Sequence, residues 1–234
     1  MYIWRMDLPI IIVNFKLYEQ AAGNADPEAL VRVSSAVELA KVHERVAKET
    51  GANIAVAVNA IDLAQVCGNV EIPVFAQHVD PVSYGSYTGH VLPGAVRDAG
   101  AVGTLLNHAE CQIDDEVLRK SIDCAKDAGL YVVACANDAD AAEKIVGYGP
   151  DLVAVEPPEL IGGDVSVSVA DPGVIKNSVE KLGEGKVLVG AGVKNGEDVR
   201  IALKLGASGV LLASGVTTAE NPYEVLMDLV LGLS

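Results

Sequence analysis

The sequence predicts an α/β protein folded as a single closed (β/α)8 barrel, with a parallel eight-stranded sheet and outer helices. Short apolar runs rich in β-branched residues recur eight times, and helical patterns separate them. The chain has 234 residues, close to the roughly 250 that such a barrel typically needs. No linker, low-complexity tract or charge block divides the chain, so we expect one domain over residues 1–234.

The expected strands are short and almost wholly apolar, which is typical of parallel strands buried on both faces. They are too short to be helices. In chain order they span residues 10–13, 54–58, 74–76, 103–106, 131–135, 152–155, 187–189 and 210–212.

Helix boundary signals lie between these runs. Asp26-Pro27 is typical of an N-cap followed by proline at the first helical position, and Gly51 follows the last turn of that helix. Further helices are expected from 114 to 129 and from 195 to about 206. Two more are expected to start at cap-then-proline signals, Asp171-Pro172 and Asn221-Pro222.

The main alternative is an open, doubly wound sheet that binds a dinucleotide. Such a sheet carries a G-x-G-x-x-G motif after its first strand. Asn14-Phe15-Lys16 stands at that place instead, so the closed barrel is favoured.

Composition argues against several functional classes. The net charge of −15 disfavours a nucleic-acid partner, because neutralising phosphates needs clustered Lys and Arg. No stretch approaches the roughly 20 apolar residues of a membrane span, and the N-terminus lacks a signal-peptide core. The four cysteines lack CxxC or metal-ligand spacing, which predicts reduced thiols in a cytoplasmic protein. Met6 could be an alternative start, which would make residues 1–5 a dispensable extension.

Polar residues follow most of the expected strands, where catalytic residues of such barrels gather. Glu156 is the first candidate, because a carboxylate ending a buried strand costs free energy unless it is paired. Taken singly, Asn14 could cap a turn, Lys16 could be solvated and His108 could be structural. Their joint position favours one active site. The full set of strand-end residues is Asn14, Lys16, Asn59, Gln77, His78, His108, Glu110, Asn137, Glu156, 190–192 and 213–215.

Two glycine-rich strand ends predict a phosphate site. Gly190-Ala191-Gly192 and Ala213-Ser214-Gly215 follow strands seven and eight, whose loops commonly hold phosphate together with a short helix. Small residues let backbone N–H groups approach the anion. The alternative is that the glycines only mark turns.

These residues together resemble the triosephosphate isomerase family. The resemblance rests on Asn14-x-Lys16, on Asn107-His108-x-Glu110 and on Glu156-Pro157 with its glycine-ended loop, and it runs from Asn14 to the end of the chain. Four phrases resemble the shorter archaeal branch: FAQHVD at 75–80, TGH at 88–90, EPPELIG at 156–162 and LLASG at 211–215.

The resemblance implies a TIM barrel that interconverts dihydroxyacetone phosphate and D-glyceraldehyde 3-phosphate through an enediolate, in glycolysis and gluconeogenesis, without metal or cofactor. It implies that Glu156 is the base and His108 the neutral electrophile. Lys16 would stabilise developing negative charge, Asn14 would orient the substrate oxygens and Glu110 would partner Lys16. It further implies a mobile lid over residues 157–165 and phosphate contacts from Ile161, Gly162, Gly192, Ala213 and Ser214.

Three residues depart from the family pattern: Ala109 after the histidine, Cys111 after the glutamate, and Asp164 at the glycine end of the lid. Asp164 places negative charge near the expected phosphate and predicts impaired closure. The alternatives are another phosphate-binding barrel enzyme, acting on sugar or indole phosphates, and a catalytically weakened binding barrel.

The resemblance also implies a homo-oligomer, because archaeal relatives form tetramers through their fourth and fifth helical layers; a dimer is the alternative. An apolar stripe over residues 114–128 is consistent with such an interface. The same stripe is equally typical of a helix face packed on the barrel.

Overall fold

The computed structural model describes residues 6–22, 34–157 and 170–233. It confirms the closed barrel: eight parallel strands pair in sequence order, and the last strand pairs with the first. Each predicted strand is present, with ends that differ by at most one residue from the prediction. The strands are β1 (Ile10–Asn14), β2 (Ile54–Val58), β3 (Val74–Ala76), β4 (Gly103–Leu106), β5 (Tyr131–Ala136), β6 (Leu152–Val155), β7 (Val187–Gly190) and β8 (Gly209–Leu212).

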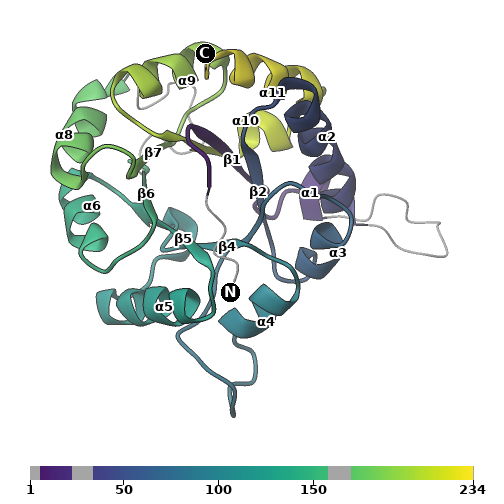
Figure 1. The fold of residues 1–234 in the computed structure, drawn as a ribbon, viewed down its shortest axis with the longest axis vertical. Coiled ribbons are helices and arrows are strands. Elements are labelled where there is room, and N and C mark those ends of the chain that lie inside the picture. Colours follow the sequence, from purple (N-terminus) through teal and green to yellow (C-terminus); the bar gives the residue numbers. More distant parts are fainter. Residues whose placement is uncertain (1–5, 23–33, 158–169, 234) are drawn as a thin grey trace.

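The helices surround the strand ring, as the view down the barrel shows (Figure 1). They are α1 (Glu19–Ala22), α2 (Ser35–Thr50), α3 (Leu63–Cys67), α4 (Pro93–Asp98), the 3-10 helix η1 (Ala109–Cys111), α5 (Asp115–Asp127), α6 (Ala139–Val146), α8 (Pro172–Leu182), α9 (Gly196–Lys204), α10 (Ser214–Thr217) and α11 (Pro222–Leu231).

Four of the five helix starts expected from sequence are confirmed, because α5, α8, α9 and α11 begin directly after their predicted caps. The helix that ends at Gly51 differs. It begins at Ser35, where the Ser34 hydroxyl accepts the Ala36 N–H. Asp26-Pro27 lies outside the described residues.

Both faces of the strands are buried, which explains why their apolar runs are continuous rather than alternating. Alternate side chains such as Ile10 and Ile12 fill the barrel interior, while Ile11 and Val13 pack against the helices. Phe75 lies in the interior against Gly103, where an added Cβ would come within 2.3 Å of the Phe75 ring. Burying such a side chain contributes about 2 kcal/mol.

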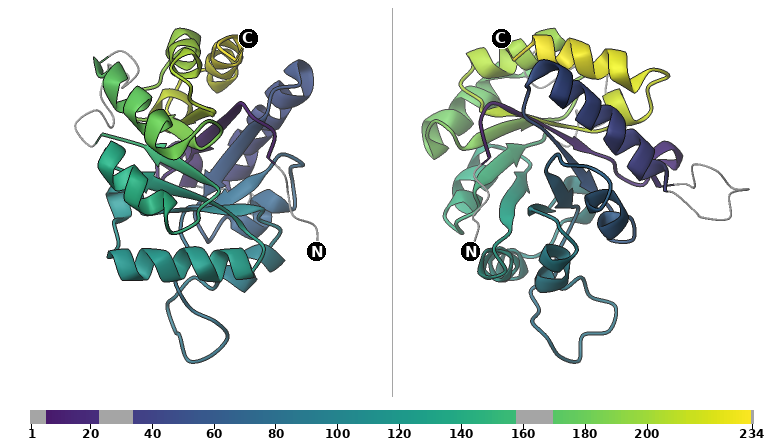
Figure 2. Two further views of the ribbon diagram at one scale, coloured as in Figure 1. Left: turned by 60° about the vertical axis from the view of Figure 1, so that its left-hand side comes forward. Right: turned by 45° about the vertical axis from the view of Figure 1, so that its right-hand side comes forward.

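Two surface features bear on the expected interactions. The apolar stripe of α5 is mostly the face packed on the barrel, since Leu118, Ile122 and Ala125 are buried there. The connection from β3 to α4 forms a long loop that projects from the molecule (Figure 2). Within the described part of the chain, no helix is long and apolar enough to cross a membrane.

Candidate active site

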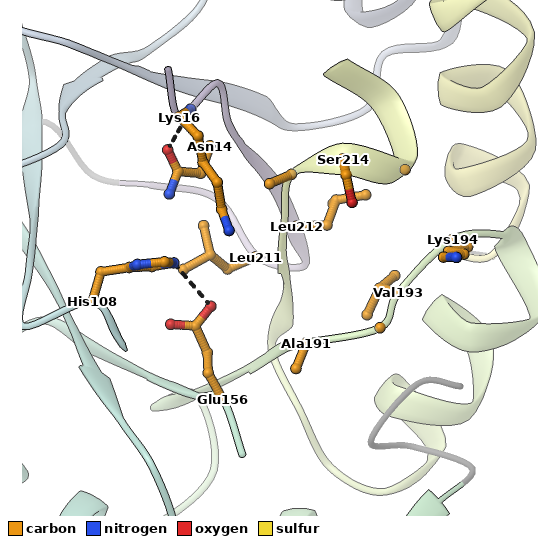
Figure 3. A pocket seen from close by; sticks show the side chains of 13 residues that line it. Asn14, Lys16, His108, Glu156, Ala191, Val193, Lys194, Leu211, Leu212 and Ser214 are labelled. Atoms are coloured by element: carbon orange, nitrogen blue, oxygen red, sulfur yellow. Dashed lines mark hydrogen bonds and ion pairs between the residues drawn. The ribbon is translucent and has the colours of Figure 1, made fainter. Parts of the chain in front are cut away.

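Four of the polar side chains expected at the barrel rim, Asn14, Lys16, His108 and Glu156, line one pocket. Asn14 ends β1, Glu156 directly follows β6, and His108 is the second residue after the end of β4. Figure 3 shows these side chains and Lys16 turned toward a common centre, with Ala191, Val193 and Ser214 on the far side. The pocket lining is Asn14, Lys16, His108, Glu156, 191–194 and 211–215.

The turn after β1 holds Lys16 in the left-handed region, at φ 48°. This conformation is uncommon for a residue with a side chain, and hydrogen bonds support it. The Lys16 N–H donates to Asn14 Oδ1 over 3.0 Å. At the other end, Lys16 Nζ donates to Glu110 Oε1 over 2.7 Å. The Lys16 side chain is 11% exposed and that of Glu110 is 57% exposed, so a rim carboxylate fixes a largely buried ammonium at the pocket.

Gln77 connects this turn to the rest of the rim, a role that the sequence did not indicate. Its Nε2 lies 3.1 Å from both Asn14 Oδ1 and the Lys16 carbonyl, and 3.3 Å from the Ala57 carbonyl. Asn14 Oδ1 therefore accepts from two donors. Within the described residues the Asn14 amide group donates to no partner, so it can donate to a ligand.

His108 is oriented by the chain that follows it. The turn η1 brings the Glu110 N–H to 3.1 Å from His108 Nδ1. Because a backbone N–H can only donate, Nδ1 must be the acceptor, and the neutral ring carries its proton on Nε2. That atom lies 3.8 Å from Glu156 Oε1. The separation exceeds a hydrogen bond, so the two groups are neighbours without being bonded to each other.

Glu156 is a buried carboxylate, 5% exposed. Burial raises the pKa of its carboxyl above the usual value, although His108, Cys135 and Lys16 oppose this shift. Among the described residues, Glu156 Oε2 has no hydrogen-bond partner. A carboxylate with an unsatisfied oxygen and a raised pKa is suited to accept a proton.

Three other strand-end residues have structural partners, which are local for Asn59 and His78 but 25 positions away for Asn137. The Asn59 side chain bonds Asp62 and accepts the Ile61 N–H. His78 lies 3.4 Å from Asp80, and Asn137 accepts from Gln112. Within the described residues, no group of three or more His, Cys, Asp or Glu side chains could hold a metal ion. The four cysteines are free.

The two glycine-rich loops face the polar cluster across the pocket. Ala191 and Gly192 are both left-handed, at φ 73° and 72°, so the chain turns sharply after β7. Gly192, Ala213 and Ser214 line the pocket, and their contact with a phosphate stays a prediction. The predicted contacts Ile161 and Gly162, and the departure at Asp164, lie outside the described residues, as does most of the expected lid.

A carboxylate, an imidazole donor and an ammonium around one pocket at a barrel rim define an acid–base enzyme of the TIM-barrel class. The family model described as triosephosphate isomerase matches residues 9–230. The chain is 44% identical over 229 residues to a triosephosphate isomerase of Methanosarcina acetivorans, covering 96% of this chain and 99% of the relative. It is 46% identical over 228 residues to that of Pyrobaculum calidifontis, covering 96% of each. The chain belongs to the triosephosphate isomerase family.

Proposed function

We propose that the protein interconverts dihydroxyacetone phosphate and D-glyceraldehyde 3-phosphate, as a cytoplasmic enzyme of glycolysis and gluconeogenesis. The observation that carries the mechanism is the gap of 3.8 Å between Glu156 Oε1 and His108 Nε2. A substrate carbon and its carbonyl oxygen can enter this gap and separate the base from the proton donor.

Starting from dihydroxyacetone phosphate, Glu156 removes a proton from the carbon beside the carbonyl, and His108 Nε2–H donates to the carbonyl oxygen. Electron density moves from the broken C–H bond into an enediolate. The Lys16 ammonium stabilises the negative charge of the enediolate, and the Asn14 amide orients its oxygens. His108 gives its Nε2 proton to the former carbonyl oxygen and takes the hydroxyl proton from the neighbouring oxygen, so one proton moves between the two oxygens. Glu156 returns its proton to the neighbouring carbon as the new carbonyl forms, so both groups are regenerated and no redox partner is consumed.

The substrate phosphate is proposed to bind on the opposite side of the pocket, at backbone N–H groups of Gly192, Ala213 and Ser214. Lining by small residues supports this placement, because backbone atoms can then approach an anion closely. Lys16, which lines the same pocket, adds positive charge. Ile161 and Gly162, in a lid over residues 157–165, would complete the site and exclude water.

A coupled assay of the purified protein with glyceraldehyde 3-phosphate tests this function. Turnover is expected, and Glu156→Asp should retain the fold while kcat falls by about 10²-fold or more, because the base moves back by one methylene. A folded wild-type protein without turnover would exclude the proposed function. An unchanged kcat in the variant would show that Glu156 is not the base.

We further propose a homo-oligomer, a tetramer with the dimer as the alternative. Leu17, Ile61 and Tyr84 are 73%, 94% and 77% exposed in the loops after β1, β2 and β3. All three stand at the end of the barrel where the strands terminate, and exposed apolar side chains that gather in one patch mark an interaction surface. Sedimentation at low and high salt tests the assembly, with Ile61→Asp and Tyr84→Asp expected to lower its mass. A monomeric wild-type protein under both conditions would contradict it.

A further inference from the structure

Asp198 is a buried carboxylate outside the reaction centre, 8% exposed in the first turn of α9. Its N–H donates to the Asn195 side chain over 3.0 Å, which caps the helix. Its own Oδ2 accepts the Lys194 N–H over 3.0 Å. Asp198 thus reaches back past the helix cap into the loop that leaves β7.

That loop forms one wall of the active-site pocket, and Lys194 is one of its lining residues. The loop also touches the second glycine-rich segment. An added Cβ on Gly215 would meet the Val193 carbonyl at 3.1 Å and Lys194 Cα at 3.5 Å. The backbones at Val193-Lys194 and Gly215 are therefore packed closely against each other.

The loop starts in a conformation that needs support. Ala191 and Gly192 are consecutive left-handed residues, and this region is unfavourable for alanine because of its Cβ. The hydrogen bond from the Lys194 N–H to a buried carboxylate fixes the loop on its far side. Such charge-assisted bonds are stronger than bonds between neutral groups.

We propose that Asp198 is a positioning residue for the substrate phosphate: it holds the β7–α9 loop so that Gly192 faces the anion. This inference rests on the proposed phosphate site. Electrostatics alone predicts the opposite effect of its removal, because deleting a negative charge near an anion site should tighten anion binding. Positioning predicts weaker binding, so the sign of the change separates the two accounts.

The test compares Asp198→Ala and Asp198→Asn with a matched control, Asp228→Ala. Asp228 Oδ2, from α11, accepts the Gly196 N–H over 2.8 Å at the same end of α9, but Asp228 is not among the residues lining the pocket. We expect Asp198→Ala to raise KM for glyceraldehyde 3-phosphate and Ki for inorganic phosphate together by about 10-fold, with little change in kcat. Asp198→Asn keeps an acceptor oxygen and should restore most of the affinity.

Asp228→Ala should lower the melting temperature while leaving the Ki for phosphate unchanged. The proposal is overturned if Asp198→Ala leaves or lowers that Ki, if Asp228→Ala raises it equally, or if Asp198→Asn binds phosphate as poorly as Asp198→Ala. Should Asp198→Ala not fold, Asp198→Leu, which is close to Asp in size and accepts no hydrogen bond, takes its place in the same comparisons. Absence of turnover in the wild type would instead exclude the proposed function.

Discussion

Gly190 and Glu156 lie so close together that position 190 has no room for a larger residue. A Cβ built on Gly190 would lie 2.2 Å from Glu156 Cγ and 2.7 Å from Glu156 Oε1. Because Gly190, the last residue of β7, has no side chain, the side chain of the proposed base Glu156 fits beside it. This role is separate from the phosphate contact that the glycine-rich segment suggests.

Gly190→Ala should consequently damage catalysis far more than folding. The backbone of Gly190 is not left-handed, so alanine fits the local conformation, and the clash is with the Glu156 side chain. Displacing a base by about 1 Å can lower the rate by roughly 10²-fold. We expect kcat to fall by that order with a small change in melting temperature. Gly68→Ala, at the end of α3, is the control, and an unchanged kcat in Gly190→Ala would contradict the steric account.

Lys16 and Glu110 should contribute very unequally to activity. Lys16→Met removes the cation at the pocket, and kcat/KM is expected to fall by more than about 10³-fold. Glu110→Gln keeps an oxygen beside Nζ and leaves the backbone N–H that orients His108. Its effect should be about 10-fold or less, and the free energy of unfolding should change by under about 1 kcal/mol, because Glu110 is exposed. Steady-state kinetics and chemical denaturation measure both, and equal kinetic losses would contradict this division.

Gln77 should be needed as a donor. Gln77→Leu leaves three acceptor oxygens without this partner, which should cost about 1–3 kcal/mol of stability and lower kcat/KM by about 10-fold. Gln77→Glu should be worse near neutral pH, because an ionised carboxylate faces the same oxygens and cannot donate. It should recover partly in acid, where the carboxyl regains a proton. A Glu variant as active as wild type at pH 8 would show that donation is not required.

The strands and the rim could be predicted from sequence, because burial on both faces leaves a strong apolar pattern and strand ends are local features. Gln77 shows where this fails. Its partners Asn14, Lys16 and Ala57 are 63, 61 and 20 positions away, so only the closed barrel brings them together. The opposite error occurs at Asn59 and His78. Both stand at strand ends, which made them site candidates, but their side chains serve local turns. The N-cap at Ser34 was missed because Asp26-Pro27 gives the stronger local signal.

Glu156 should make the protein less stable as the pH rises, because burial raises the pKa of this carboxyl in the folded state. Below the pKa of the unfolded chain, near 4.5, both states hold the proton and folding costs nothing extra. As the pH rises above that value, the unfolded chain loses its proton first, and the native state is destabilised until its own pKa is passed. The destabilisation of the wild type by Glu156 should therefore be small at pH 4 and larger at pH 8.

Glu156→Gln removes this titration, so its melting temperature should exceed that of the wild type at pH 8 and approach it at pH 4. Both proteins retain His43, whose pKa burial lowers to about 4, so acid destabilisation from His43 cancels in the difference. The kcat of the variant should be about 10²–10⁴-fold lower, as expected for loss of a general base. Calorimetry at the two pH values measures the difference. A stability difference that stays constant with pH would show that the Glu156 carboxyl has no raised pKa in the folded protein.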